Sequence, residues 1–157
     1  MTPTSMTVPP VPSLTRCFDV VVHLGPIEDH GPTRVGHRRV VPISGGEITG
    51  DIEATVLPGG ADWQVVRPDG TVELDARYSA RTRGGGLVLI HAAGVRTGTP
   101  KTLQALLDGS EVAPDSYYFR TQITLECAHD PELERRLFIG SCLRTRDAVR
   151  YVAYRVD

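Results

Sequence analysis

The sequence contains no long hydrophobic run and none of the short motifs that identify common enzyme classes. A helix needs about 20 consecutive apolar residues to cross a bilayer, and the apolar stretches here are only a few residues long. There is no GxSxG, no HExxH, no P-loop and no GxGxxG after a predicted strand. We therefore expect no membrane partner, and any chemistry must come from residues outside these motifs.

An excess of charge of one sign is also missing. Seventeen Lys and Arg residues stand against nineteen Asp and Glu residues, which gives a formal net charge of -2. Nucleic-acid-binding proteins usually concentrate basic residues on one face, so we expect no nucleic-acid partner. The five histidines are dispersed, with no pair at metal-ligand spacing. We therefore expect no metal site.

Cysteine is scarce and is not arranged in pairs. The three cysteines, Cys17, Cys127 and Cys142, lie far apart and outside any CxxC motif. An odd number at wide spacing disfavours a disulfide framework and indicates small buried thiols in a reducing compartment. The first twelve residues lack the basic start and apolar centre of a signal peptide. Together these features predict a cytoplasmic protein.

Strand patterns dominate the sequence. Its 157 residues suit a single domain, which we place at 14–157 after a flexible Thr/Pro/Val tail at 1–13. Runs of β-branched and aromatic residues, several of them alternating with polar residues, predict strands. These runs lie at 14–24, 36–43, 47–57, 61–67, 71–82, 87–97, 117–127, 137–144 and 149–156. Two Gly-Pro pairs predict a long loop at 25–34.

Turn and cap signals connect these segments. The turn Pro68-Asp69-Gly70 predicts a hairpin, because proline presets φ and glycine accepts a positive φ. One convincing helix is predicted, with Thr99 as its N-cap, Pro100 as its first residue and Gly109 at its C-terminal end. A shorter helical turn is predicted at Asp130-Pro131.

These elements predict an all-β fold. About eight or nine strands with one short helix, and no alternation of strands with helices, favour an antiparallel sandwich or barrel over a parallel sheet. A closed antiparallel β-barrel is favoured over an open sandwich, because closure removes the exposed strand edges.

The stretch from Leu57 to Trp63, LPGGADW, is the most unusual local feature. Its Pro-Gly-Gly corner joins two predicted strands and delivers Asp62 and Trp63. One interpretation is structural, with a core tryptophan and an aspartate that caps backbone amides. The other is functional, with Trp63 as a flat wall for a ring-shaped ligand and Asp62 as a base or hydrogen-bond acceptor.

Other polar residues on the predicted strands are further site candidates. Asp75 and Arg77 alternate with apolar neighbours, as a solvated outer face or a polar barrel interior would. Tyr78 lies on the opposite face of the same strand, so Arg77 and Tyr78 cannot both point into one pocket. A further group of candidates contains Arg96, Tyr118 and Arg120. An arginine beside an aromatic ring can stack on it, can orient an anionic oxygen, or can donate hydrogen bonds to carbonyls at a strand end. These candidates are Asp75, Arg77, Tyr78, Arg96, Tyr118 and Arg120.

Five segments, taken in order, resemble the DUF3237 family, also called UPF0311. They are 42–46 (PISGG), 57–64 (LPGGADWQ), 67–70 (RPDG), 74–78 (LDARY) and 118–121 (YFRT). The resemblance runs from about Leu14 to the C-terminus and implies a compact antiparallel β-barrel. The segment 128–140 lacks the tryptophan and asparagine of the usual family pattern, so no role is carried over for that segment. Proteins of this kind often occur beside small-molecule metabolism, which implies a cyclase-, isomerase- or hydratase-like role without a redox cofactor.

Two functions remain open at this point. The first is a cofactor-independent cyclase or isomerase that acts on a small aromatic or polyketide-like molecule in a barrel pocket, by acid–base or pericyclic chemistry. Asp62 or Asp75 would be the acid or base, and an arginine (Arg77, Arg96 or Arg120) would lie at a carbonyl or enolate oxygen. Trp63 would shape the substrate, and Tyr78 and Tyr118 would donate hydrogen bonds. The second is a lipocalin-like carrier or sensor of a small hydrophobic ligand. A filled barrel acting as a scaffold is a third option, and an outer strand face is available for a homodimer.

Overall fold

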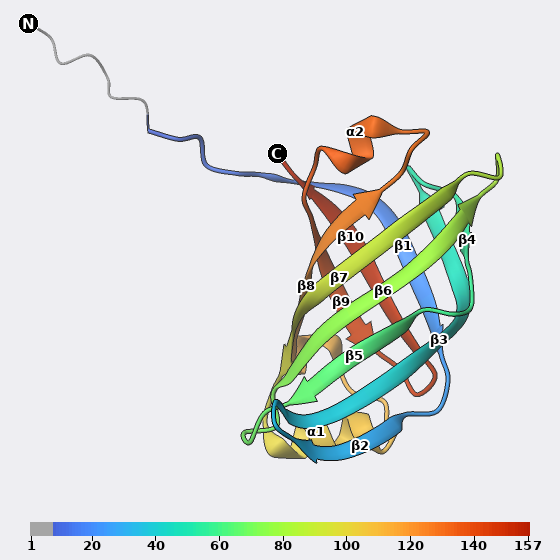
Figure 1. The fold of residues 1–157 in the computed structure, drawn as a ribbon. Helices are drawn as coiled ribbons and strands as arrows, with labels where there is room; N and C mark the ends of the chain where they lie inside the picture. Colours follow the sequence, from blue (N-terminus) through green and yellow to red (C-terminus); the bar gives the residue numbers. More distant parts are fainter. Residues whose placement is uncertain (1–7) are drawn as a thin grey trace, which may run out of the picture.

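The structure is a computed structural model that describes residues 8–157, and its strands close into a barrel (Figure 1). The strands are β1 (Leu14–Leu24), β2 (Glu28–Thr33), β3 (Gly36–Gly50), β4 (Ala54–Val56), β5 (Ala61–Val66), β6 (Val72–Thr82), β7 (Leu87–Thr97), β8 (Tyr118–Glu126), β9 (Phe138–Arg144) and β10 (Ala148–Val156). The helices are α1 (Pro100–Leu107), the 3-10 turn η1 (Pro114–Ser116) and α2 (Pro131–Glu134).

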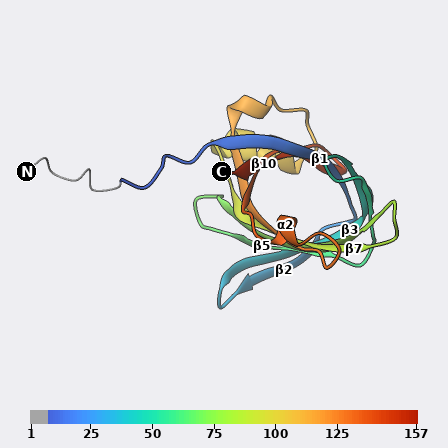
Figure 2. The ribbon, with the colours of Figure 1, turned by 90° about the horizontal axis from the view of Figure 1, so that it is seen from above.

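Antiparallel pairing runs around the whole ring, as the view along the barrel shows (Figure 2). The order is β1-β10-β9-β8-β7-β6-β4-β3, and pairing of β1 with β3 closes it. The short strands β4 and β5 share one position, because each of them pairs with both β3 and β6. The result is a closed eight-stranded antiparallel barrel with two extra strands, so the predicted barrel is confirmed.

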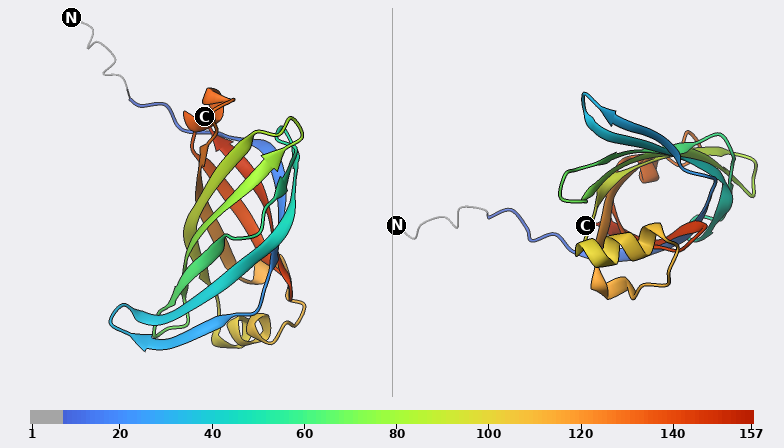
Figure 3. Two further views of the ribbon diagram at one scale, coloured as in Figure 1. Left: turned by 45° about the vertical axis from the view of Figure 1, so that its right-hand side comes forward. Right: turned by 90° about the horizontal axis from the view of Figure 1, so that it is seen from below.

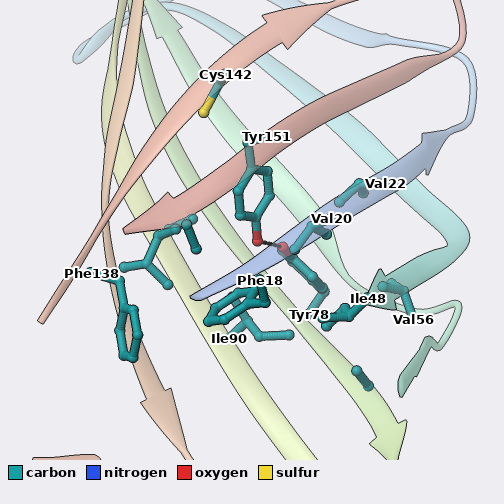
Figure 4. Packing of buried hydrophobic residues seen from close by; sticks show 14 of the residues in the cluster. Phe18, Val20, Val22, Ile48, Val56, Tyr78, Ile90, Phe138, Cys142 and Tyr151 are labelled. Carbon is teal, nitrogen blue, oxygen red and sulfur yellow. Dashed lines mark hydrogen bonds between the residues drawn. The ribbon is translucent and has the colours of Figure 1, made fainter. Parts of the chain in front are cut away.

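The barrel interior is filled mainly by alternate residues of the long strands. On β6 the even-numbered residues from Val72 to Ala80 face inward, as the alternation predicts. Two aromatic rings, Phe18 on β1 and Phe138 on β9, pack with their centroids 5.4 Å apart. Across the interior, the hydroxyls of Tyr78 and Tyr151 point at one another and are hydrogen-bonded (Figure 4).

The Pro-Gly-Gly corner lies between β4 and β5 and presses against β6. Gly59 has a φ of 108°, which side chains rarely tolerate. At Gly60 a Cβ atom would lie 2.5 Å from the carbonyl oxygen of Arg77 and 2.5 Å from Cβ of Tyr78. Glycine is therefore required at both positions, for conformation at the first and for space at the second. The corner sets where β5 begins and hence where Asp62 points.

Two expectations about the first third of the chain are wrong. The segment expected to be a loop at 25–34 contains β2, which pairs with β3. Pro32 is tolerated there because β2 is an edge strand that pairs on one side only. The strand expected to end near Pro42 continues to Gly50 as β3. Pro42 lies opposite Ala61 of β5, and its carbonyl accepts a hydrogen bond from Gly25 N at 2.9 Å.

The predicted turn and caps are confirmed. Gly70 has a φ of 86° in the β5–β6 turn, and Asp69 accepts a hydrogen bond from Thr71 N at 2.9 Å. Helix α1 follows Thr99, whose side chain accepts a hydrogen bond from Thr102 N at 3.2 Å. Gly109 just beyond the helix has a φ of 76°.

The chain before β1 is only partly described. Residues 8–13 are exposed and precede the first strand, and the remainder of the tail expected at 1–13 lies outside the described residues. Within 8–157, no helix has the length and apolar character needed to cross a bilayer. The three cysteines are free and buried.

Candidate functional site

Asp62 is a carboxylate buried in the barrel wall, with 8% of its surface exposed. Successive side chains of β5 alternate, so Asp62 and Gln64 face inward while Trp63 faces outward. One Asp62 oxygen, Oδ2, accepts a hydrogen bond from Gln64 Nε2 at 2.8 Å. The other, Oδ1, accepts one from the backbone N of Asp75 at 3.0 Å. Both oxygens are therefore held in fixed positions.

The backbone explains why Asp62 can bond to strand β6. The β5–β6 ladder pairs Asp62 with Ala76 and then Val65 with Glu73, and it skips the residues between them. In this gap the Asp62 carboxylate replaces a backbone carbonyl as the acceptor for the Asp75 amide. Asp62 therefore caps a backbone amide, as the structural interpretation of this residue expected.

Burial raises the pKa of Asp62 above its ordinary value of 3.8. The hydrogen bonds from Gln64 and Asp75 and the positive charge of Arg96 act in the opposite direction, but burial is the largest effect. A carboxyl group with a raised pKa and two fixed hydrogen bonds can serve as a proton donor or acceptor.

A small cavity of about 50 Å³ lies inside the barrel next to Asp62. Its wall is mostly apolar, with a few polar groups. The polar lining comes from Asp62, Thr121, Cys142, Tyr78 and Tyr151. The apolar lining includes Val22, Ile43, Leu74 and Phe119. Ligand pockets usually measure about 300–1,000 Å³, so this space accepts the end of a molecule and not the whole of one.

Tyr78 and Tyr151 form the polar pair of this cavity. Burial is the main cause that raises the pKa of each phenol above its ordinary value, so both remain protonated hydrogen-bond donors. Cys142 projects from β9 close to Tyr151 (Figure 4), and burial raises the pKa of its thiol to about 12. Its thiol is therefore a poor nucleophile.

Three arginines face inward at one end of the barrel, the end near α1. Arg39 lies on β3, Arg96 on β7 and Arg144 on β9. Arg96 is buried, with 8% exposure, and its guanidinium carbon lies 5.4 Å from the centre of the Phe119 ring. Burial lowers the pKa of Arg96 to about 10, and the charges of Arg144 and Arg39 add to this effect.

A hollow of about 360 Å³ opens beside these arginines, between α1 and the rim of the barrel. Its lining includes Arg39 and Arg96 together with Val72, Leu103 and Leu107. Seen from below, α1 lies along one side of this end of the barrel (Figure 3). Arg96 lines this hollow, and its charge acts on Asp62, which lines the inner cavity. We call this hollow the α1 groove.

The structure divides the residues predicted from the sequence into two groups. Asp62, Tyr78 and Arg96 lie inside the barrel. Trp63, Asp75, Arg77, Tyr118 and Arg120 lie on its outer face. Trp63 is 40% exposed and so is neither a core residue nor a wall of the interior cavity.

The outer residues have partners of their own. Asp75 Oδ1 lies 2.7 Å from His91 Nε2, and Arg77 Nε lies 3.8 Å from the same carboxylate. The Arg120 guanidinium carbon lies 5.6 Å from the centre of the Tyr118 ring. These groups form ordinary surface pairs, because their strand positions have outward parity.

The sequence reasoning missed Arg39, Gln64, Thr121, Arg144 and Tyr151. Strand parity was the available signal, since Arg39 shares its face with Val41 and Ile43, and Arg144 shares its face with Phe138 and Cys142. Alternation along a strand shows which residues share a face, but it does not show which strands meet at the same end of the barrel. Within 8–157, no group of three or more His, Cys, Asp or Glu side chains is placed to hold a metal ion.

Comparison with known proteins identifies relatives along almost the whole chain. Residues 12–156 match the model of a family described as "Protein of unknown function (DUF3237)". A UPF0311 protein of Bradyrhizobium diazoefficiens is 37% identical over 134 residues, which cover 84% of this chain and 88% of that protein.

Solved structures share the barrel. A conserved protein of unknown function from Rhodopseudomonas palustris superimposes with a TM-score of 0.89 at 35% identity, over 96% of this chain and 100% of that one. A protein described as an enzyme from Penicillium herquei superimposes with a TM-score of 0.67 at 18% identity, over 96% and 98% of the two chains, and shares the fold. The resemblance drawn from the five sequence segments is confirmed: the chain belongs to the DUF3237 family, also named UPF0311.

Proposed function

We propose that this protein is a cofactor-independent enzyme that moves a proton on a small, partly aromatic or polyketide-like molecule, in an isomerisation or ring closure. The observation that carries the proposal is the buried Asp62, whose carboxylate lines the inner cavity with a pKa raised by burial. A carboxyl group that exists only to cap an amide does not need to border an open space.

The groups around Asp62 supply the remaining parts of such a reaction. Asp62 would accept a proton from a carbon or hydroxyl of the substrate and return it at another atom. The positive charge of Arg96 would stabilise the enolate oxygen that forms after proton removal. The hydroxyls of Tyr78 and Tyr151 stay protonated, and whichever of them accepts the hydrogen bond within the pair can donate its own proton to a carbonyl oxygen.

The two spaces suit different parts of the substrate. The α1 groove, at about 360 Å³, is large enough for the body of a small molecule. The inner cavity, at about 50 Å³, would receive its reacting end. The Penicillium herquei barrel is described as an enzyme, which makes catalysis compatible with this scaffold.

A carrier of a small hydrophobic ligand is the second candidate. The observation that favours it is the mostly apolar lining of the inner cavity. A carrier needs the same spaces but no group that exchanges protons. The two functions therefore predict the same binding and different chemistry.

Proton exchange in deuterated water distinguishes the two functions. The purified protein, with nothing added, would be incubated with a panel of aromatic ketones and 1,3-dicarbonyl compounds, and deuterium incorporation would be followed by NMR. The wild type should accelerate exchange or rearrangement of at least one compound. Asp62→Asn should lower that rate by about 100-fold or more, the usual size of a general-base contribution.

A variant outside the site serves as the control for this experiment. Glu126→Gln, at an exposed position of β8, should exchange at the wild-type rate. Saturable binding of the same compounds without exchange, equal in wild type and Asp62→Asn, would identify a carrier. Unchanged turnover in Asp62→Asn would remove Asp62 from the mechanism.

A further inference from the structure

Positive charge is concentrated at the α1 end of the barrel. The proposed proton transfer uses only one arginine, Arg96, whereas three arginines lie there. Arg39, Arg96 and Arg144 enter this end from three different strands, and their charges influence one another. Asp62 is the one buried carboxylate within 8–157, and its charge acts on Arg96. Three guanidinium groups thus face one acid in a partly dehydrated space, where like charges repel strongly.

Each of these arginines has a buried nitrogen without a hydrogen-bond partner among the described residues. The atoms are Nε of Arg39, Nε of Arg96 and one terminal nitrogen, Nη1, of Arg144. A buried donor left unpaired costs about 1–3 kcal/mol, and more when it is charged. Arg96 is the strongest case, because it is both 8% exposed and part of the lining of the α1 groove.

Two of the arginines are also held in place before any ligand binds. Arg39 Nη2 donates to Gln64 Oε1 at 3.0 Å, and Gln64 is in turn bonded to Asp62. Arg96 stacks over the ring of Phe119. Fixed donors lose little conformational freedom on binding, so they favour a ligand that matches their positions.

The acids near the rim offset this charge only in part, although Asp29 acts on Arg39 and Asp69 lines the α1 groove. Asp29 lies 2.6 Å from His37 and accepts a hydrogen bond from Gly31 N. Asp69 bonds to Thr71 N in the β5–β6 turn. Asp147, in the β9–β10 turn, acts on Arg144 alone among the three. The three arginines therefore keep an excess of positive charge.

We propose that the α1 groove is an anion-binding site that takes the carboxylate of a small aromatic acid, held by Arg39 and Arg96, which both line it. The aromatic part packs on the apolar lining, which includes Val72 and Leu103. A planar carboxylate suits the fork of a guanidinium, which can donate two parallel hydrogen bonds. The inference rests on the same site as the proposed function and adds its substrate class, but it does not require catalysis.

Benzoate and benzamide form a matched pair of probes, because they differ in charge and scarcely in shape. Isothermal titration calorimetry at low salt should show benzoate binding at least about tenfold more tightly than benzamide, which corresponds to about 1.4 kcal/mol. Arg96→Met should weaken benzoate binding by about tenfold or more and leave benzamide binding nearly unchanged. Arg150→Gln, at an exposed position of β10, should bind both as the wild type does.

Failure of this inference can be separated from failure of the proposed function. Equal affinity for benzoate and benzamide, or wild-type benzoate binding by Arg96→Met, would overturn the anion site and leave the deuterium-exchange result on neutral carbonyl compounds to decide catalysis. Should Arg96→Met unfold, Arg39→Met at a half-buried position gives the same comparison. Benzoate binding that persists in an inactive Asp62→Asn protein would support both proposals.

Discussion

The carboxylate of Asp62 accepts the backbone amide of Asp75 at 3.0 Å, across a gap in the ladder between β5 and β6. A side chain here performs the work of a backbone carbonyl, while its other oxygen faces Gln64. Structure and chemistry therefore share one group. Removing the charge and removing the hydrogen bonds are separate changes, and different variants test them.

The pH dependence of stability reports the charge of Asp62. Its pKa is higher in the folded protein than in the unfolded chain, mainly because of burial. The folded state therefore holds more protons between these two pKa values, and the free energy of unfolding falls as the pH rises through that window. Asp62→Asn lacks this group, so wild-type stability relative to Asp62→Asn should fall with rising pH.

Urea unfolding of the two proteins between pH 4 and pH 8 measures this difference. Other acids with shifted pKa values, such as Asp29 and Asp157, are common to both proteins and cancel. Parallel curves over the whole range would mean that burial does not raise the Asp62 pKa. Asp62→Ala should be less stable than Asp62→Asn by about 1–3 kcal/mol, because it leaves the Asp75 amide unpaired.

Gly60 should not tolerate even one added methyl group. The Cβ of an alanine would lie 2.5 Å from the Arg77 carbonyl oxygen, so β5 or β6 would have to move. We expect Gly60→Ala to lower the free energy of unfolding by about 1–3 kcal/mol, the usual cost of overpacking. Gly84→Ala is the matched control, because nothing lies within 4 Å of its Cβ position. It should change stability by less than about 0.5 kcal/mol, and similar losses in both variants would contradict the steric argument.

The Tyr78–Tyr151 pair should behave as a coupled unit. Tyr78→Phe or Tyr151→Phe alone leaves the other buried hydroxyl without its partner, at a cost of about 1–3 kcal/mol. The double variant removes both hydroxyls and should lose less stability than the sum of the two single changes. Tyr118→Phe, on the outer face, should have almost no effect. Additive losses from chemical denaturation would show that the two hydroxyls do not interact.

The three thiols should resist modification in the native protein. Cys17, Cys127 and Cys142 are buried, and the Cys142 pKa of about 12 leaves almost no thiolate at pH 8. Absorbance with Ellman's reagent should rise slowly in buffer and rapidly, to three equivalents, in guanidinium chloride. Fast labelling of the native protein would indicate that the barrel opens readily.

Local patterns predicted much of this fold. The bounds expected for β1 and β7 agree with the structure, because their alternation and flanking turns are local. The strand β2 escaped prediction because its Gly-Pro pair is tolerated only at a sheet edge, and edge position is a tertiary property. The predicted strand end at Pro42 was wrong for the same reason. A proline is tolerated inside β3 because β3 changes its pairing partner just after this residue, from β5 to β4.

The site was less predictable than the fold. Asp62 stood out from its motif, and strand parity separated Arg77 from Tyr78, as expected from alternation. The convergence of Arg39, Arg96 and Arg144 depends on the order of strands around the ring, which no local pattern contains. Trp63 was expected to be a core residue or a ligand wall, yet alternation beside an inward Asp62 turns it outward.

The shared position of β4 and β5 has a consequence for how the wall opens. Between Val56 and Ala61 the Pro-Gly-Gly corner separates the two strands, and the β5–β6 ladder is then interrupted just after Asp62. In contrast, β6 and β7 pair continuously from Val72 to Arg81. Local opening is easiest where backbone pairing is sparse. The amides of β5 should therefore exchange their hydrogens with solvent sooner than those of β6 and β7, so that water reaches the buried carboxylate through a seam in the wall without unfolding the barrel.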